Sequence, residues 1–190
     1  MSGKPIILSL MGGPGCGKGT VSAQICQHYN CGYMSAGDLL RAAAKTDKAL
    51  GEMLTNGVIV PQEITIGLLK AEIERQAKDF YIIDGFPRKV DQADTFEATV
   101  NPFAAMIFID VSDEVLLSRL LNRAQTSEVK RSDDTPEGFQ KRLKVFHDVS
   151  YPVLEHFQKK NKAFVIKGEG SKEEVYAAVS KVIDSILHKN

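Results

Sequence analysis

The chain has 190 residues and carries 24 Lys and Arg against 24 Asp and Glu, so its formal net charge is zero. This balance argues against a long nucleic-acid interface, which needs a basic surface, so any strong positive field has to be local. No apolar run approaches the roughly 20 residues of a membrane-spanning helix, and the run at 6–11 is too short for the core of a signal peptide. The length favours one domain over residues 1–190.

The three cysteines, Cys16, Cys26 and Cys31, are odd in number and form no CxxC pair. They are typical of reduced thiols in a cytoplasmic protein and argue against a disulfide framework or a zinc site. Cys16 lies within a glycine-rich loop, where a reactive thiolate is one reading. The favoured reading is a small residue that fills a tight turn.

Short apolar runs alternate with helical patterns along the chain. Strands are predicted at 5–11, 32–34, 79–84, 104–110 and 162–167. Helical patterns cover 18–29, 37–56 with a break, 61–77, 89–98, 112–123, 135–160 and 171–187. The strand segments 80–83 and 104–109 are apolar on both faces, which is typical of parallel strands covered by helices on two sides. The pattern predicts a doubly wound α/β domain of about five strands, with ligands at the carboxyl ends of the strands.

Residues 12–20 follow the first predicted strand and read Gly-Gly-Pro-Gly-Cys-Gly-Lys-Gly-Thr. Glycines allow backbone N–H groups to turn inward and form a concave anion site. A helix that begins near Gly17 directs its positive end at the same site, and Lys18 adds a charge that can follow a phosphoryl group in transfer. The loop therefore predicts a P-loop nucleotide-binding domain, although Gly19 separates the lysine from the hydroxyl of Thr20.

The third predicted strand ends in Asp84-Gly85-Phe86-Pro87-Arg88. Asp84 is placed to hold Mg²⁺, directly or through water, although a turn-forming or helix-capping aspartate is the alternative. Asp110 ends the next strand in the same way, so Asp84 is favoured because Gly85 permits close approach of backbone and Arg88 offers a bidentate fork for phosphate.

Further basic residues follow other predicted strands or flank a polar segment. Ser35-Ala36-Gly37-Asp38-Leu39-Leu40-Arg41 comes after the second strand; Ser35 or Asp38 can serve as a helix N-cap, and Arg41 alone would be a solvated side chain. Arg123 and Arg142 flank the aperiodic polar residues 124–134, and Arg131 lies within them. With Lys18 and Arg88, these arginines can balance the charge of two facing nucleotides. Residues 37–60 and 124–134 are predicted to close over the site.

Motifs typical of several other protein classes are absent from the sequence. It contains no Ser-His-Asp order, HExxH or Cys/His cluster, and Asn161-Lys162-Ala163-Phe164 lacks the aspartate of a guanine-specificity motif. No general base is evident, which agrees with a phosphate acceptor, because a phosphate with a second pKa of about 6 is mostly dianionic at neutral pH.

Together these motifs resemble the adenylate kinase and UMP/CMP kinase family of nucleoside monophosphate kinases, over nearly the whole chain. The resemblance also includes GVIVP at 57–61, RSDD at 131–134, YPV at 151–153 and the turn at 168–171. It implies reversible transfer of the γ-phosphoryl group of Mg·ATP to a nucleoside monophosphate by a monomer that binds neither nucleic acid nor membrane. The similarity is closest to short-lid adenylate kinases, since the segment 123–134 is short and has no metal-site cysteines. It departs from the usual short lids in being about two residues longer.

The resemblance also implies roles for individual residues. The ATP phosphates would be bound by Gly13, Gly15, Cys16, Gly17, Lys18, Gly19 and Thr20, with Arg123 stacked on the adenine, Gly170 contacting it through backbone, and Asp84 holding Mg²⁺ through water. The acceptor site would lie within 35–60 and the turn after the third strand, and would comprise Ser35, Ala36, Gly37, Arg41, Val58, Ile59, Val60, Gly85, Phe86, Arg88 and Gln92. Arg131 and Arg142 would also belong to the acceptor site and would bridge the transferring group. The catalytic set is therefore Lys18, Arg88, Arg131 and Arg142.

The base of the acceptor is less clearly indicated. Ala36 stands where adenylate kinases often have threonine, and it matches many UMP/CMP kinases. Lys89 and Gln92 argue the other way, because a glutamine amide offers both a donor and an acceptor to the N6/N1 edge of adenine; an exposed helical glutamine is the alternative. The sequence favours AMP over UMP or CMP, and a non-catalytic nucleotide-binding regulatory module remains the rival from another class.

Overall fold

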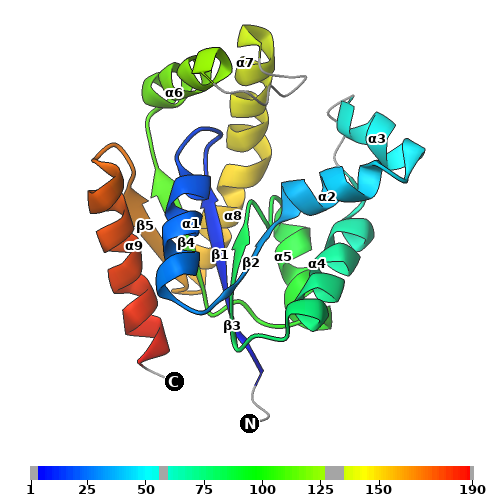
Figure 1. The fold of residues 1–190 in the computed structure, drawn as a ribbon, viewed down its shortest axis with the longest axis vertical. Coiled ribbons are helices and arrows are strands. Elements are labelled where there is room, and N and C mark those ends of the chain that lie inside the picture. Colours follow the sequence, from blue (N-terminus) through cyan, green and yellow to red (C-terminus); the bar gives the residue numbers. More distant parts are fainter. Residues whose placement is uncertain (1–3, 56–59, 127–134, 189–190) are drawn as a thin grey trace.

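A parallel β-sheet forms the centre of the molecule in the computed structural model, which describes residues 4–55, 60–126 and 135–188. Its five strands have the spatial order β2-β3-β1-β4-β5 (Figure 1). They are β1 (Ile6–Gly12), β2 (Gly32–Ser35), β3 (Phe80–Asp84), β4 (Ala105–Asp110) and β5 (Ala163–Lys167). Every neighbouring pair is parallel, so the doubly wound α/β fold predicted from the sequence is confirmed.

Helices cover both faces of this sheet. One face packs against α1 (Lys18–His28) and α9 (Lys172–Leu187), and the other against α4 (Gln62–Gln76), α5 (Val90–Thr99) and α8 (Tyr151–Lys159). Four further helices stand beyond the carboxyl ends of the strands (Figure 1): α2 (Ala36–Ala44), α3 (Lys48–Thr55), α6 (Asp113–Thr126) and α7 (Pro136–Val145). Among the described residues, no helix has the length and apolar character needed to cross a membrane.

The two faces of the sheet hold two separate hydrophobic cores. In β1, Ile7 and Leu8 are both fully buried but belong to different cores, because successive side chains of a strand point to opposite faces. Ile7 shares its core with Phe96 and Phe157, whereas Leu8 shares the other with Ile25. The apolar strand sequences therefore reflect burial on two sides, as predicted.

Strand β5 is less covered than its apolar sequence predicts. Phe164 and Val165 remain 36% and 48% exposed. The strand lies at the edge of the sheet, and among the described residues it pairs only with β4. An edge strand has a neighbour on one side alone, so part of its apolar surface stays in contact with solvent.

Two helical patterns are divided in the structure. The break predicted within 37–56 is confirmed: α2 ends at Ala44, and Asp47 accepts a hydrogen bond from the Leu50 N–H (3.1 Å) where α3 begins. The pattern at 135–160 becomes α7 and α8, joined by a π-helical turn, Phe146–Ser150. Helix α6 continues to Thr126 and so includes the first three residues of the segment 124–134.

A buried hydroxyl links the central strand to the turn that follows β3. Ser9 is fully buried in β1, and its Oγ donates a hydrogen bond to the carbonyl oxygen of Phe86 at 2.7 Å. We expect Ser9→Ala to lower the free energy of unfolding by about 1–3 kcal/mol, because it leaves a buried carbonyl without its donor. Urea unfolding followed by circular dichroism measures this change.

The matched control is Ser185→Ala. Ser185 is exposed on α9, and its hydroxyl donates to the carbonyl of Val182 at 2.7 Å. A surface change of this kind is expected to alter the free energy of unfolding by less than about 0.5 kcal/mol. Equal losses in the two variants would contradict the role given to the Ser9 hydrogen bond.

Candidate active site

The loop between β1 and α1 has the backbone conformation that the sequence predicts for an anion site. Gly15 and Gly17 have φ values of 86° and 102°, in the region that side chains rarely tolerate, and Gly17 is the N-cap of α1. A Cβ atom on Gly12 would lie 2.5 Å from the carbonyl oxygen of Ile109, so this position also requires glycine. The loop thus places the N-terminus of α1 at the carboxyl end of the central strand.

Lys18 is held within this loop by backbone carbonyls. Its Nζ donates hydrogen bonds to the carbonyl oxygens of Gly12 (2.8 Å) and Gly13 (3.1 Å), and it lies 3.5 Å from the Sγ of Cys16. Cys16 is only 2% exposed, which agrees with its interpretation as a small residue in a tight turn. The ammonium group is therefore fixed against the backbone carbonyls of the loop.

Asp84 ends β3 directly beside the loop. It lies opposite Leu10 of β1 and Ser35 of β2 in the parallel registers. The hydroxyl of Tyr33 donates a hydrogen bond to Asp84 Oδ2 at 3.0 Å. Burial raises the pKa of Asp84, while the charge of Lys18 and the hydrogen bond from Tyr33 act in the opposite direction. Burial and the Asp84 carboxylate also raise the pKa of Tyr33, so its phenol remains a protonated donor at neutral pH.

The turn after β3 exposes Arg88 and buries its neighbours. Gly85 has a φ of 73°, and its N–H donates to the carbonyl of Leu10 at 3.1 Å. Phe86 is 1% exposed and packs against Phe96 with ring centroids 5.5 Å apart, so its side chain belongs to the hydrophobic core. Arg88 is exposed, and its Nε donates to the carbonyl of Gly85 at 3.1 Å.

Gln92 is buried beneath this turn, so the alternative of an exposed helical glutamine is wrong. The side chain is 5% exposed, and its Oε1 accepts a hydrogen bond from the N–H of Arg88 at 2.8 Å. This contact fixes which end of the amide is oxygen. It also couples the glutamine to the backbone that carries the guanidinium of Arg88.

The segment after β2 places a second arginine near the same edge of the sheet. Ser35 is the N-cap of α2, and its Oγ accepts a hydrogen bond from the N–H of Asp38 at 3.2 Å, so the capping role is confirmed for Ser35. Asp38 instead pairs with Arg41 one turn along the helix. A Cβ on Gly37 would lie 3.1 Å from the Arg41 guanidinium, so glycine leaves room for it.

Small and apolar side chains complete the described part of this segment. Ala36 is 4% exposed and Val60 is 6% exposed, so both belong to the protein interior. The predicted acceptor-site residues Val58 and Ile59 lie outside the described residues.

On the opposite side of the loop, Arg119 of α6 connects two segments that the family resemblance assigns to ATP binding. Its guanidinium donates to the carbonyl of Cys16 (3.4 Å) and to that of Gly168 (2.9 Å). The turn is further held by Ser112, whose N–H and hydroxyl both donate to Glu169 Oε1. Sequence reasoning named Arg123 and Gly170 here and missed Arg119, although it precedes Arg123 by one helical turn on the same side of α6.

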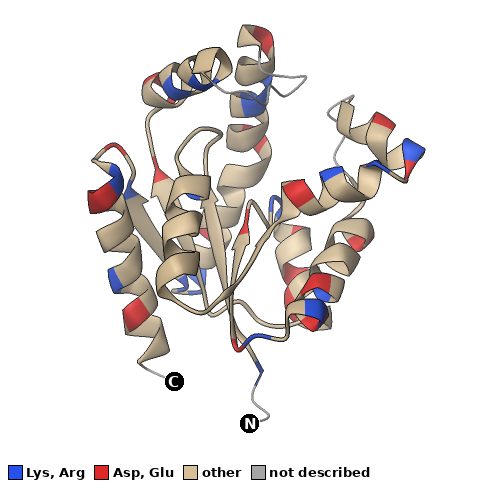
Figure 2. Ribbon diagram, in the orientation of Figure 1, with Lys and Arg blue, Asp and Glu red and all other residues tan. Residues whose placement is uncertain are grey.

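Two of the remaining predicted arginines lie on helices α6 and α7, near the loop. Arg123 is in the last turn of α6, and Arg142 lies in α7 with its guanidinium 5.0 Å from the centre of the Phe139 ring. Figure 2 shows Lys and Arg on α6, α7 and α2, around the carboxyl ends of the strands. Arg131, predicted to bridge the transferring group, lies outside the described residues.

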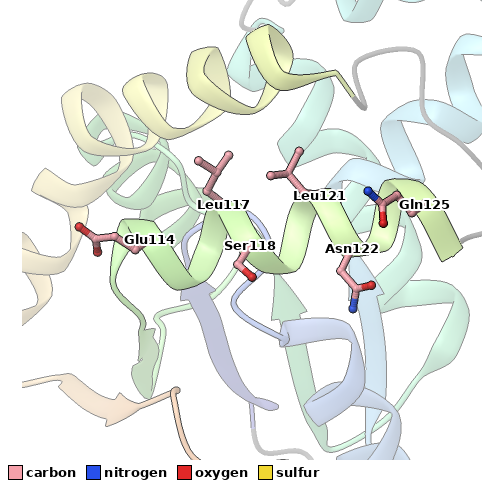
Figure 3. Close-up of a pocket in the computed structure, with 6 residues that line it drawn as sticks. All are labelled: Glu114, Leu117, Ser118, Leu121, Asn122 and Gln125. Atoms are coloured by element: carbon pink, nitrogen blue, oxygen red, sulfur yellow. The ribbon is translucent and has the colours of Figure 1, made fainter.

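A cavity of about 490 Å³ lies along α6, but it is a different surface from the loop. Its lining comes from one helix, as Figure 3 shows: Glu114, Leu117, Ser118, Leu121, Asn122 and Gln125. The face of α6 that meets the loop carries Leu116, Arg119 and Leu120 instead. The ligand site indicated by the loop therefore does not include this cavity.

The site fits a metal ion that binds together with the phosphates of a nucleotide. The described residues contain no group of three or more His, Cys, Asp or Glu side chains able to hold an ion by themselves. Mg²⁺ is usually bound through one or two carboxylates together with phosphates and water. Asp84 meets this requirement, because it presents a single carboxylate beside the phosphate loop.

A family model described as adenylate kinase matches residues 10–162. The chain belongs to the adenylate kinase family. The match spans the phosphate loop, the turn after β3 and helices α6 and α7, so the family assignment covers the described site except for the turn at Gly168–Ser171.

The relatives of this protein include kinases that are named for different phosphate acceptors. It is 40% identical to a uridylate kinase of Saccharomyces cerevisiae, over 95% of this chain and 92% of the relative. It is 38% identical to adenylate kinase 1 of Schistosoma mansoni, over 93% and 92%, and 39% identical to UMP-CMP kinase 3 of Arabidopsis thaliana, over 98% and 93%. The protein is thus a phosphotransferase of the nucleoside monophosphate kinase class, and identity alone does not separate AMP from UMP or CMP.

The contacts of Arg119 generate a prediction for nucleotide binding. We expect Arg119→Ala to raise the Kd for ATP roughly tenfold or more, because it removes charge-assisted hydrogen bonds that join the loop to the Gly168 turn. Isothermal titration calorimetry measures this constant. Arg75→Ala is the control, since Arg75 is an exposed arginine of α4 that pairs with Glu72. An unchanged Kd in Arg119→Ala would remove Arg119 from the ATP side of the site.

Proposed function

We propose that this kinase transfers the γ-phosphoryl group of Mg·ATP to AMP in the reversible reaction ATP + AMP ⇌ 2 ADP. The observation that carries the proposal is the placement of positive groups on two sides of one sheet edge. Lys18 and Arg119 lie at the loop between β1 and α1, and Arg88 and Arg41 lie beyond β3 and β2. Two phosphate-bearing ligands that meet between these groups would have their charges balanced from both sides.

The donor half of the proposed reaction uses the loop. Its inward N–H groups and the N-terminus of α1 hold the phosphates of ATP. Lys18 exchanges its contacts with the carbonyls of Gly12 and Gly13 for contacts with phosphate oxygens, and it stabilises the charge of the transferring group. Asp84 would hold Mg²⁺ through water, and the bound ion would neutralise charge on the phosphates.

The acceptor half uses the arginines beyond β2 and β3. Arg88 and Arg41 orient the monophosphate so that its oxygen faces the γ-phosphoryl group, and Arg142 neutralises charge from the side of α7. A proton acceptor is not needed, because the attacking phosphate is mostly dianionic at neutral pH. Catalysis then rests on positioning and on electrostatic stabilisation.

The choice of AMP rests on the fixed amide of Gln92. With Oε1 bonded to the Arg88 N–H, Nε2 is the end that can donate to a base. Adenine N1 accepts such a hydrogen bond, and the second lone pair of Oε1 can accept from the exocyclic amine. Uracil and guanine carry a proton on the corresponding ring nitrogen, so two donors would meet and a buried group would remain unpaired.

A pyrimidine acceptor is the second candidate, and Ala36 favours it. This buried alanine supplies no hydroxyl to the base pocket, and relatives named uridylate kinase and UMP-CMP kinase are as similar as those named adenylate kinase. Cytosine also presents an unprotonated ring nitrogen, so the Gln92 contact admits CMP more readily than UMP. A panel of AMP, CMP, UMP, GMP and dCMP with Mg·ATP separates these acceptors.

Lys18→Met tests the proposed phosphoryl transfer. Methionine keeps most of the side-chain volume but removes the charge, so we expect kcat to fall by a factor on the order of 10²–10³ or more. Label transfer from γ-³²P-ATP to the monophosphate measures the rate, and circular dichroism checks the fold. A variant that keeps half of the original kcat would contradict the role of Lys18.

Gln92→Glu tests how the base is recognised. Glutamate keeps an oxygen for the Arg88 N–H but replaces the donor Nε2 with a second acceptor. We expect kcat/KM for AMP to fall at least tenfold relative to that for UMP, measured with both acceptors in the original protein and the variant. If UMP or CMP exceeds AMP in the original protein, the proposal of AMP is wrong. If AMP leads and the ratio is unchanged in Gln92→Glu, the base is recognised elsewhere.

A further inference from the structure

A tyrosine of the neighbouring strand contacts the carboxylate that the proposed function assigns to the metal ion. Tyr33 lies in β2 and is half-buried, and its hydroxyl donates to Asp84 Oδ2 at 3.0 Å. The two residues are 51 positions apart in the chain, and only the parallel pairing of β2 with β3 brings them together. Among the described residues, no hydrogen-bond donor is placed on the other oxygen, Oδ1.

We propose that Tyr33 is a positioning residue that fixes the orientation of the Asp84 carboxylate, so that Oδ1 faces the metal–phosphate site. This inference rests on the proposed binding of Mg²⁺ by Asp84. A carboxylate on a short side chain can rotate about its terminal torsion, and that torsion has broad preferences. A hydrogen bond to one oxygen selects one rotation and leaves the second oxygen for the ion or its water.

Such outer contacts matter for metal sites in general. Residues that orient a metal ligand typically change metal affinity by about 10–100-fold when they are removed. The effect is expected to be at the lower end here, because Mg²⁺ is also held by the phosphates. Tyr33 would act through Asp84, because its hydroxyl donates to that carboxylate.

Tyr33→Phe removes only the hydroxyl and tests the inference. We expect the Mg²⁺ concentration for half-maximal activity to rise about tenfold. The affinity of the protein–ATP complex for Mn²⁺, measured by the electron paramagnetic resonance signal of free Mn²⁺, should fall by a similar factor. Binding of ATP in the presence of EDTA, measured by calorimetry, should remain unchanged, because the phosphate loop is intact.

Tyr81→Phe is the matched control. Tyr81 lies in β3 and is 1% exposed, and its hydroxyl accepts from the N–H of Lys78 and donates to the carbonyl of Ile73 (2.8 Å) at the end of α4. This variant also loses a tyrosine hydroxyl that is hydrogen-bonded in a strand of the sheet, so it reproduces any general loss of stability. Its Mg²⁺ and Mn²⁺ constants should equal those of the original protein.

Asp84→Asn separates failure of this inference from failure of the proposed function. If Asp84→Asn weakens Mn²⁺ binding but Tyr33→Phe does not, Asp84 binds the metal and the positioning role of Tyr33 is overturned. If neither variant changes Mn²⁺ binding, the proposed metal role of Asp84 fails as well. Equal shifts in Tyr33→Phe and Tyr81→Phe would also overturn the inference, because they would show a general effect on stability.

Discussion

The contact of the Lys18 ammonium with the carbonyls of Gly12 and Gly13 is the interaction around which the site is arranged. It requires a backbone that turns back on itself within a few residues, so glycines occupy the positions with positive φ. It also requires that the loop leave the central strand and enter α1 at once. The other charged groups of the site are placed relative to this fixed point by strands β2 and β3 and by helix α6.

The parallel sheet converts positions that are distant in sequence into neighbours. Because every strand runs in the same direction, the residues that end β1, β2 and β3 meet at one edge. The sequence predicted this much: the strands, most of the helices, and the placement of the phosphate loop, Asp84 and Arg88 at their carboxyl ends. These predictions succeeded because they depend on apolar periodicity and on glycine and aspartate at strand ends, which are local signals.

The contacts that the sequence could not supply are those between side chains of different elements. Arg119 has no local signal that separates it from other helical arginines, and its role emerges only because α6 crosses over the loop near Gly168. Tyr33 looks like an ordinary aromatic strand residue until β2 pairs with β3. Burial of Gln92 beneath Arg88 follows from how α5 packs after the turn. The exposure of β5 likewise depends on strand order, which periodicity does not encode.

The strand order has a consequence for how the chain folds during synthesis. Strand β1 is made first, yet it lies in the middle of the sheet between β3 and β4. Its last partner residue in β4 is Ile109, opposite Gly12. At about 5–20 residues per second of translation, the apolar residues of β1 wait on the order of 5–20 s for both neighbours. The nascent chain therefore carries an incompletely paired hydrophobic strand until β4 has been made, and only then can the contact between Gly12 and Ile109 at the start of the phosphate loop form.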